Sequence, residues 1–276
     1  MSGHLRTSAA LFLPFALAVA SPGALTARSF DFVQTGPAAG ETRPESVVAP
    51  PSKGLVEDVD CSAFEVDSPS PFGYEKTLDL GVQALHLARA EPDKDARKCL
   101  YRMAEAFSRH LLFENPNDPQ PRHLYSVAMG LRARDEGVRT RVRLAQHSFE
   151  QAQLILGVVP GHAGAQHIMG RLYAHAMRLN GLKRFIAIQI LGGEAMSYAS
   201  WEEAESLLAA AARLQPEVAD HHYQLGVLYL DTDRPELALA AFERVLSCDV
   251  IQPIDLKIRV LAREMVERLQ GERVAA

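Results

Sequence analysis

From residue 74 to about residue 270 the apolar positions of the chain recur every three or four residues. This is the period of an α-helix with one buried face, and it predicts an all-α protein built from amphipathic helices. Turn sequences divide the pattern into helices that pair along the chain. The first pair ends at Asn115–Pro119, the second spans about 119–133 and 140–157, two more pairs follow, and a last helix begins near Pro253. The sequence therefore predicts about four helix pairs and a C-terminal capping helix.

A short pattern of small, aromatic and turn residues occurs twice between Pro160 and Asp249. Its members are Gly170, Tyr173, Ala204, Pro216, Leu225, Gly226, Tyr229, Ala238 and Phe242. The spacing around Leu225 matches that of a 34-residue helix-turn-helix repeat. Such a repeat needs a small residue on each helix where its two helices cross, and Gly226 with Ala238 fills these two places. One such pair cannot bury its apolar face alone, so neighbouring pairs must stack.

The runs His162–Arg171, Arg184–Gly193 and Ala199–Ala204 carry a narrower resemblance. They resemble tetratricopeptide proteins of the regulator of microtubule dynamics type, particularly the bacterial exported relatives. The resemblance covers roughly residues 74–270. It implies a right-handed tetratricopeptide-type solenoid. For function it implies an adaptor associated with the cytoskeleton, as in the eukaryotic relatives.

The third helix pair contains an insertion. Gly170 and Ala204 are 34 residues apart, whereas Gly226 and Ala238 are 12 apart, a difference of 22 residues. We predict a helical domain over 73–271 with an inserted helix near 181–199. The insert is rich in apolar residues, which favours packing on the solenoid over exposure to water. Lys183 and Arg184 leave a helix on a membrane surface as the alternative.

The N-terminal residues 1–27 have the order of a secretory signal peptide. A start carrying Arg6 precedes an apolar run, and small residues follow as candidate cleavage sites. Residues 28–72 are rich in proline and lack periodicity, as in a disordered tail or linker. We expect an exported protein, periplasmic or secreted, with no stable membrane insertion after cleavage. Removing Arg6 with residues 1–27 changes the net charge from −5 to −6, which gives no general attraction to nucleic acid.

Three cysteines, Cys61, Cys99 and Cys248, form an odd set. An oxidising compartment permits one disulfide and leaves one thiol. Cys99 and Cys248 fall on predicted helices, where a free cysteine packs as a small hydrophobe. We expect no structural disulfide, with Cys61 as the exposed thiol.

We find no nucleotide-binding, nucleophile-elbow or zinc-protease motif, and expect no catalytic residue, metal or cofactor. The histidines do not share a helix face at the spacing that zinc sites prefer. His167 and His175 could approach His221 and His222 if adjacent helices stack. A metal-dependent hydrolase that uses these histidines is therefore the alternative from another functional class.

The concave surface of the predicted solenoid is the candidate binding site. In such a stack its inward-facing residues are Gly164, His167, Arg171, Ala174, Asp220, Tyr223, Val227 and Leu230, with Val127, Leu131 and Arg134 from the second pair. This mixed polar and aliphatic face suits an extended peptide or a partner helix. The leading hypothesis is a non-enzymatic scaffold of the cell envelope that binds a protein or peptide in this groove. Occupation of the groove by the insert or by the tail is the other possibility.

The turn between the two helices of the second pair is rich in arginine. The residues are Arg132, Arg134, Arg139, Arg141 and Arg143, with Asp135 and Glu136 as the nearby acids. They predict either a basic patch for an anionic partner or a solvated turn with arginines on the helix surface.

Overall fold

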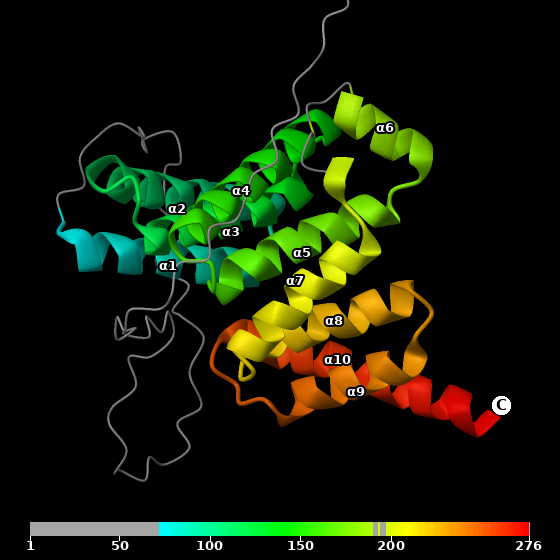
Figure 1. Cartoon of the computed structure of the whole chain (residues 1–276). Helices are drawn as coiled ribbons and strands as arrows, with labels where there is room; N and C mark the ends of the chain where they lie inside the picture. Colours follow the sequence, from blue (N-terminus) through cyan, green and yellow to red (C-terminus); the bar gives the residue numbers. More distant parts are fainter. Residues whose placement is uncertain (1–71, 190–192, 194–196, 276) are drawn as a thin grey trace, which may run out of the picture. The chain divides into compact units, whose positions relative to one another are not determined.

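The computed structural model describes residues 72–189, 193 and 197–275. These residues form helices joined by short turns (Figure 1). The helices are α1 (Tyr74–Ala90), α2 (Lys94–Glu114), α3 (Pro119–Arg132), the 3-10 helix η2 (Ala133–Asp135), α4 (Val138–Val158), α5 (Ala163–Arg178), α6 (Gly181–Gln189), α7 (Trp201–Leu214), α8 (Ala219–Asp231), α9 (Pro235–Ser247) and α10 (Pro253–Ala275). The predicted signal peptide, 1–27, and nearly all of the proline-rich segment, 28–72, lie outside the described residues.

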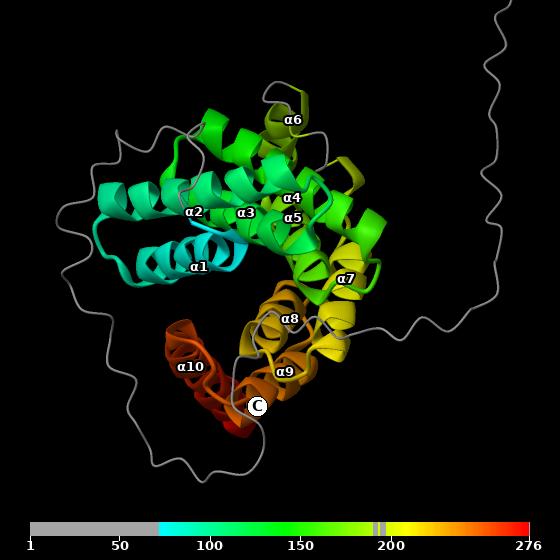
Figure 2. The same ribbon diagram turned by 90° about the vertical axis from the view of Figure 1, so that its left-hand side faces the viewer.

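The helices pack as four pairs in chain order: α1 with α2, α3 with α4, α5 with α7, and α8 with α9. Helix α10 packs on α8 and α9 and so covers the end of the stack. The first helices of successive pairs, α1, α3, α5 and α8, contact one another. We call these four the inner helices; in Figure 2, α1 and α8 lie on the inner side, with α2, α7 and α9 outside them. The predicted all-α solenoid is confirmed.

The first and last helices of the stack also meet. Arg89 Nη1 in α1 donates a hydrogen bond of 3.2 Å to Oε1 of Gln252, 163 residues later in the sequence. The Asp255 carboxylate fixes this corner, because it accepts hydrogen bonds from the backbone N–H groups of Ile251 and Gln252 at 2.9 and 2.7 Å. The inner helices therefore end at a contact between α1 and the start of α10.

Close approach of paired helices depends on small residues at the crossing points. A Cβ atom on Gly226 would lie 2.6 Å from the Phe242 ring, and one on Gly170 would lie 2.8 Å from Leu208 Cγ. The backbone oxygen of Ala204 lies 3.1 Å from the same added Cβ on Gly170. Ala204 and Ala238, the small residues of the second helices, are fully buried. Since real Cβ atoms do not approach so closely, the helix pairs hold this separation only with glycine.

The second pair uses a different solution at its crossing point. Ser126 of α3 and Ser148 of α4 are both fully buried. The Ser126 hydroxyl donates to the Ser148 carbonyl at 2.7 Å, and the Ser148 hydroxyl donates to the Ser126 carbonyl at 2.8 Å. Each buried hydroxyl is thereby satisfied, which avoids the cost of about 1–3 kcal/mol for an unpaired buried donor.

Side-chain caps begin several helices. The Asp93 carboxylate accepts hydrogen bonds from two backbone N–H groups in the first turn of α2. The Ser200 hydroxyl accepts one from Glu203 N at 3.0 Å, as the capping sequence predicts. Trp201 follows in the first turn of α7 and packs against the core formed by α4, α5, α7 and α8.

The inserted helix α6 packs less completely than its composition predicts. Ala187 is buried, but Leu182 and Phe185 are 70% and 58% exposed. The expectation that the solenoid covers the apolar face of the insert is therefore wrong for Phe185, and Ile190 and Leu191 of the insert lie outside the described residues. In the described part of the chain, no helix combines the length and apolar character needed to cross a membrane.

The cysteines correct another expectation. Cys99 in α2 is disulfide-bonded, whereas no structural disulfide was expected. Helical periodicity does not show which cysteines form a disulfide. Cys248 is a free, buried thiol, and Cys61 lies outside the described residues.

The crossing points give a direct test of what sets the helix spacing. Gly226→Ala should lower the free energy of unfolding by about 1–3 kcal/mol, because its new methyl group overlaps the Phe242 ring. Gly157→Ala is the matched control: a Cβ there meets nothing within 4 Å, and it should be neutral or stabilise by up to about 1 kcal/mol. Urea denaturation followed by circular dichroism measures both. Equal stability of parent and Gly226→Ala would show that the crossing tolerates a side chain.

Candidate functional site

The inner helices share one register. Each has a small residue seven positions after its first residue: Gly81, Ser126, Gly170 and Gly226. Three positions earlier stand Leu78, His123, His167 and Tyr223, and one position later stand Val82, Val127, Arg171 and Val227. An arginine also stands eight positions after each small residue: Arg89, Arg134, Arg178 and Arg234. The register therefore aligns side chains from successive pairs along the same face.

Histidines and an aspartate join α5 to α8 in this face. Nδ1 of His167 lies 2.8 Å from Nδ1 of His221, and Nε2 of His167 lies 3.4 Å from Oδ2 of Asp220. Both histidines are buried. Arg171 Nη1 lies 3.7 Å from the same aspartate oxygen. This His–His–Asp–Arg arrangement, which we call the polar junction, ties the third and fourth pairs together.

The partners fix the protons in the polar junction. The Asp220 carboxylate only accepts, so neutral His167 carries its proton on Nε2 and presents Nδ1 as an acceptor. His221 must then donate from its own Nδ1. Burial lowers the pKa of His167, although the hydrogen bond to Asp220 opposes this. The protein therefore holds both rings neutral near pH 7.

The other histidines have local structural roles. His162 caps α5, because its Nδ1 accepts from Ala165 N at 3.1 Å. Its ring lies 5.0 Å from the ring of His123, which packs directly over Gly164. His222 Nε2 lies 2.9 Å from the Pro216 carbonyl, to which it donates. Among the described residues, no three or more His, Cys, Asp or Glu side chains are placed to hold a metal ion.

Arginines gather on the inner helices: Arg171 in the middle of α5, and Arg89, Arg134 and Arg178 at or just after a helix end. Burial lowers the pKa of Arg89 in α1, and the charges of Arg171 and Arg134 lower it further, against the opposing effect of Asp220. His175 is exposed to solvent but crowded by protein atoms, and this desolvation lowers its pKa to about 4. Nearby Arg171, Arg178 and Arg134 add to that shift. We call Arg89, Arg134, Arg171 and Arg178 the inner arginines; their positive charges act on one another and on the same small region.

Only two of the inner arginines have a carboxylate partner among the described residues. Arg171 pairs with Asp220, and Arg178 donates to Asp231 at 2.8 Å from Nε. Arg89 is held by the neutral Gln252 amide. Arg89 and Arg134 make no ion pair with any described residue. The fourth arginine of the register, Arg234, turns away toward Glu205 of α7 and the Tyr229 ring.

The fourth pair makes the other part of the face apolar. Tyr223, Val227 and Leu230 are partly buried and pack against the core of α8, α9 and α10. The Tyr223 ring lies 5.6 Å from that of Phe242. Asp220 of the polar junction stands one turn before Tyr223 on the same helix, so the apolar residues lie next to the polar junction.

The structure brings together part of the predicted groove. Arg171, Asp220 and Arg134 share one electrostatic environment, while His167 is only 7% exposed and offers little surface to a partner. Sequence reasoning missed Arg89 and His123. The spacing of eight residues from the small residue would have revealed Arg89, but serine in place of glycine at position 126 concealed the register of the second pair.

A comparison of sequences places this architecture in a known family. The family model described as "Regulator of microtubule dynamics protein 1-3" matches residues 79–270. The chain belongs to this family. The matched residues run from α1 to α10, so the family resemblance covers all four pairs, the inserted α6 and the capping helix. No curated protein matches the sequence.

A solved structure is also similar to the chain. It is TTC0263, described as a thermophilic TPR protein in Thermus thermophilus. The identity is 20%, the alignment covers 72% of this chain and 82% of that chain, and the TM-score is 0.44.

The polar junction predicts a pH-dependent stability. Burial and the neighbouring His167 lower the pKa of His221 to about 3, whereas an unfolded histidine has a pKa of about 6.5. Below pH 6.5 the unfolded chain thus binds a proton that the folded protein does not. This contribution to stability is complete above pH 6.5 and is lost as the pH falls toward 3, by about 1.4 kcal/mol per pH unit.

We therefore expect His221→Gln to flatten the pH dependence. Between pH 7 and pH 5 the parent should lose about 2 kcal/mol more free energy of unfolding than this variant. Urea denaturation at the two pH values measures the difference. His147→Gln, which alters an exposed histidine, is the control and should keep the pH dependence of the parent. If His221→Gln also keeps it, His221 is not the group that titrates.

Proposed function

We propose that this protein is a non-enzymatic scaffold of the cell envelope that binds an acidic segment of a partner protein on the face of its inner helices. The observation that carries the proposal is that the four inner arginines lie close together and only two of them pair with a described carboxylate. Arg89 and Arg134 lack an ion-pair partner among the described residues, so a ligand carboxylate can approach without displacing an internal one. Arginine suits this role because its planar guanidinium binds a carboxylate through two parallel hydrogen bonds.

The apolar part of the same face adds a second contact type. Tyr223, Val227 and Leu230 are held by the core behind them and keep part of their surface accessible. Apolar side chains of a bound segment would bury this surface, while the inner arginines orient its acidic residues. The ligand that fits is thus a segment with both acidic and apolar residues.

The roles of the histidines support a binding protein over an enzyme. His167 and His221 hold α5 to α8, and His162 caps α5. These side chains are occupied in helix contacts, and none forms a pair of nucleophile and base with a neighbouring serine or cysteine in the described contacts.

Peptide binding tests the proposal. A fluorescent peptide of alternating glutamate and leucine should bind, and more weakly at high salt, because the charges attract across water. Arg89→Gln/Arg134→Gln should weaken binding at least about tenfold, or about 1.4 kcal/mol. Fluorescence anisotropy measures the affinity, and circular dichroism confirms that the variant is folded. Arg134→Gln alone, at an exposed residue, should give part of the loss.

The matched control is Arg139→Gln/Arg213→Gln. Both arginines are exposed, lie outside the inner face, and change the net charge equally. This control should bind within about twofold of the parent, a difference below about 0.5 kcal/mol. An equal loss in both double variants would mean that net charge alone attracts the peptide. Tight binding of a lysine–leucine peptide would exclude an acid-specific site.

Export is part of the proposal and has two supports. The N-terminal residues have the order of a signal peptide, and the Cys99 disulfide suits an oxidising compartment. Expression of the full chain in a bacterium should give an envelope form whose first residue lies between 19 and 28, as measured by intact mass. An uncleaved cytosolic protein would contradict this part of the proposal.

A further inference from the structure

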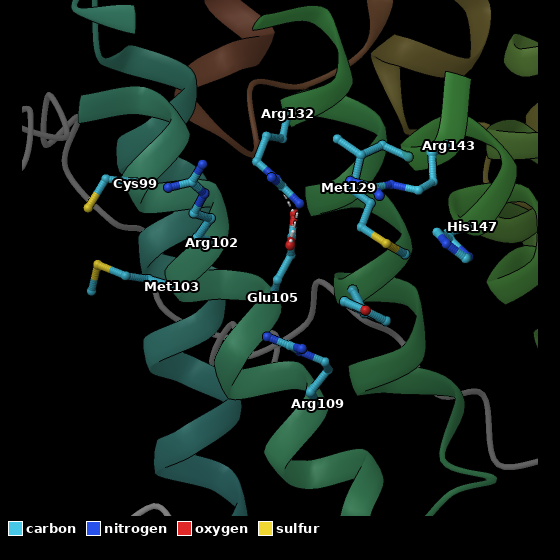
Figure 3. Close-up of a pocket in the computed structure, with 11 residues that line it drawn as sticks. Cys99, Arg102, Met103, Glu105, Arg109, Met129, Arg132, Arg143 and His147 are labelled. Atoms are coloured by element: carbon cyan, nitrogen blue, oxygen red, sulfur yellow. Dashed lines mark hydrogen bonds and ion pairs between the residues drawn. The ribbon is translucent and has the colours of Figure 1, made fainter. Parts of the chain in front are cut away.

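A cleft lies on another part of the molecule, between α2, α3 and α4. Its volume is about 340 Å³, within the range of about 300–1,000 Å³ common for small-molecule sites. Four arginines and one glutamate line it: Arg102, Arg109, Arg132, Arg143 and Glu105. With His147 neutral, these side chains carry a net charge of +3. Figure 3 shows the Glu105–Arg132 pair between the flanking arginines.

Helical spacing aims the basic residues into the cleft from two sides. Arg102 and Arg109 are seven residues apart on α2, so they lie on one face two turns apart. Arg143 and His147 are four apart on α4 and also share a face. Helix α3 lies between the two and contributes Tyr125, Met129 and Arg132 to the lining. The cleft is therefore a product of how the first two pairs stack.

An ion pair without net charge, Glu105 with Arg132, forms the floor of the cleft. Glu105 is 6% exposed and accepts two hydrogen bonds from Arg132, at 2.7 Å from Nε and 2.9 Å from Nη2. Burial raises the pKa of Glu105, but the hydrogen bonds from Arg132 oppose this. Glu136 stands 3.4 Å from Arg132 Nη1 and 4.0 Å from Arg102. The carboxylates near the cleft are thus engaged by Arg132 and, at one end, by Arg102.

Arg109 and Arg143 keep their charges available. Both are exposed, and neither makes an ion pair with a described residue. Tyr125 lies beside them, where burial raises its pKa and the charge of Arg109 opposes that shift. The remaining walls are apolar and come from Met103, Met129 and Leu144. The lining thus combines cations and a phenol, which can donate hydrogen bonds to an anion, with apolar surface.

We propose that this cleft binds a small molecule that carries phosphate or carboxylate groups on a compact apolar body. Two unpaired guanidinium groups on facing helices suit a multiply charged anion, which each can contact through two hydrogen bonds. The thioether and leucine surfaces would pack against the apolar body. This site is separate from the inner face, because its lining includes none of the inner arginines.

The test uses two probes of known chemistry, pyrophosphate and citrate, titrated separately into the full chain at constant ionic strength in a calorimeter. We expect saturable binding of one stoichiometric equivalent of at least one probe. Binding of only pyrophosphate identifies a phosphate site, and binding of only citrate identifies a carboxylate site. Arg109→Gln/Arg143→Gln should weaken the binding at least about tenfold.

Two control variants make the result specific. Arg213→Gln/Arg263→Gln removes the same charge from exposed positions on α7 and α10, away from the cleft, and Arg89→Gln/Arg134→Gln removes it from the inner face. Both control variants should bind the probe as the parent does. Loss of anion binding in the cleft can therefore be distinguished from loss of peptide binding on the inner face. Absence of binding by either probe, or equal losses in all double variants, would overturn the proposal. Binding of a tetraglutamate peptide with neither small anion bound would instead indicate an acidic protein segment and would also overturn it.

Discussion

The distance between the two helices of each pair is the constraint on which the rest of this structure depends. Glycine at positions 170 and 226 lets side chains of the second helix touch the backbone of the first, and Gly81 admits Leu124 of the next inner helix as well as Phe107 of α2. Ser126 achieves a similar approach only because Ser148 satisfies its buried hydroxyl. Once this distance is fixed, the rotation of each inner helix is fixed too. Every residue at a given spacing from the small one then faces the same way in each pair.

The arginine eight positions after each small residue shows the consequence. Arg89 and Arg178 lie in the last turn of their helices, where the helix dipole favours a positive charge. Arg134 lies in η2, just after α3, and Arg234 lies just after α8, at the start of α9. In the third pair Arg178 meets Asp231 of the next inner helix, and in the fourth Arg234 meets Glu205. Such pairs connect successive helices. In the first two pairs no described carboxylate takes that place, so Arg89 and Arg134 keep an uncompensated positive charge.

The features that could be predicted from the sequence are those that depend on the periodic spacing of residues. The paired helices, the capping helix and the crossing at Gly226 follow from local spacing, because each depends on residues within one or two helices. The exposure of Phe185 could not be predicted, since composition reveals an apolar face but not whether a neighbour covers it. Of the arginines that line the cleft, Arg132 and Arg143 belong to the arginine-rich turn that the sequence marked, whereas Arg102 and Arg109 were missed for a related reason. The lining arginines come from different pairs, and only their stacking brings them to one site.

The contact between Arg89 and Gln252 gives the inner face a property that an ion pair would remove. A carboxylate in place of the Gln252 amide would hold Arg89 as firmly but would cancel its charge. The neutral amide accepts from one of the five guanidinium N–H donors and leaves the positive charge of Arg89 uncompensated. Fixing the side chain in advance also reduces the conformational entropy lost on binding. Under the proposed function, the join between the first and last helices therefore holds Arg89 in place for an acidic ligand.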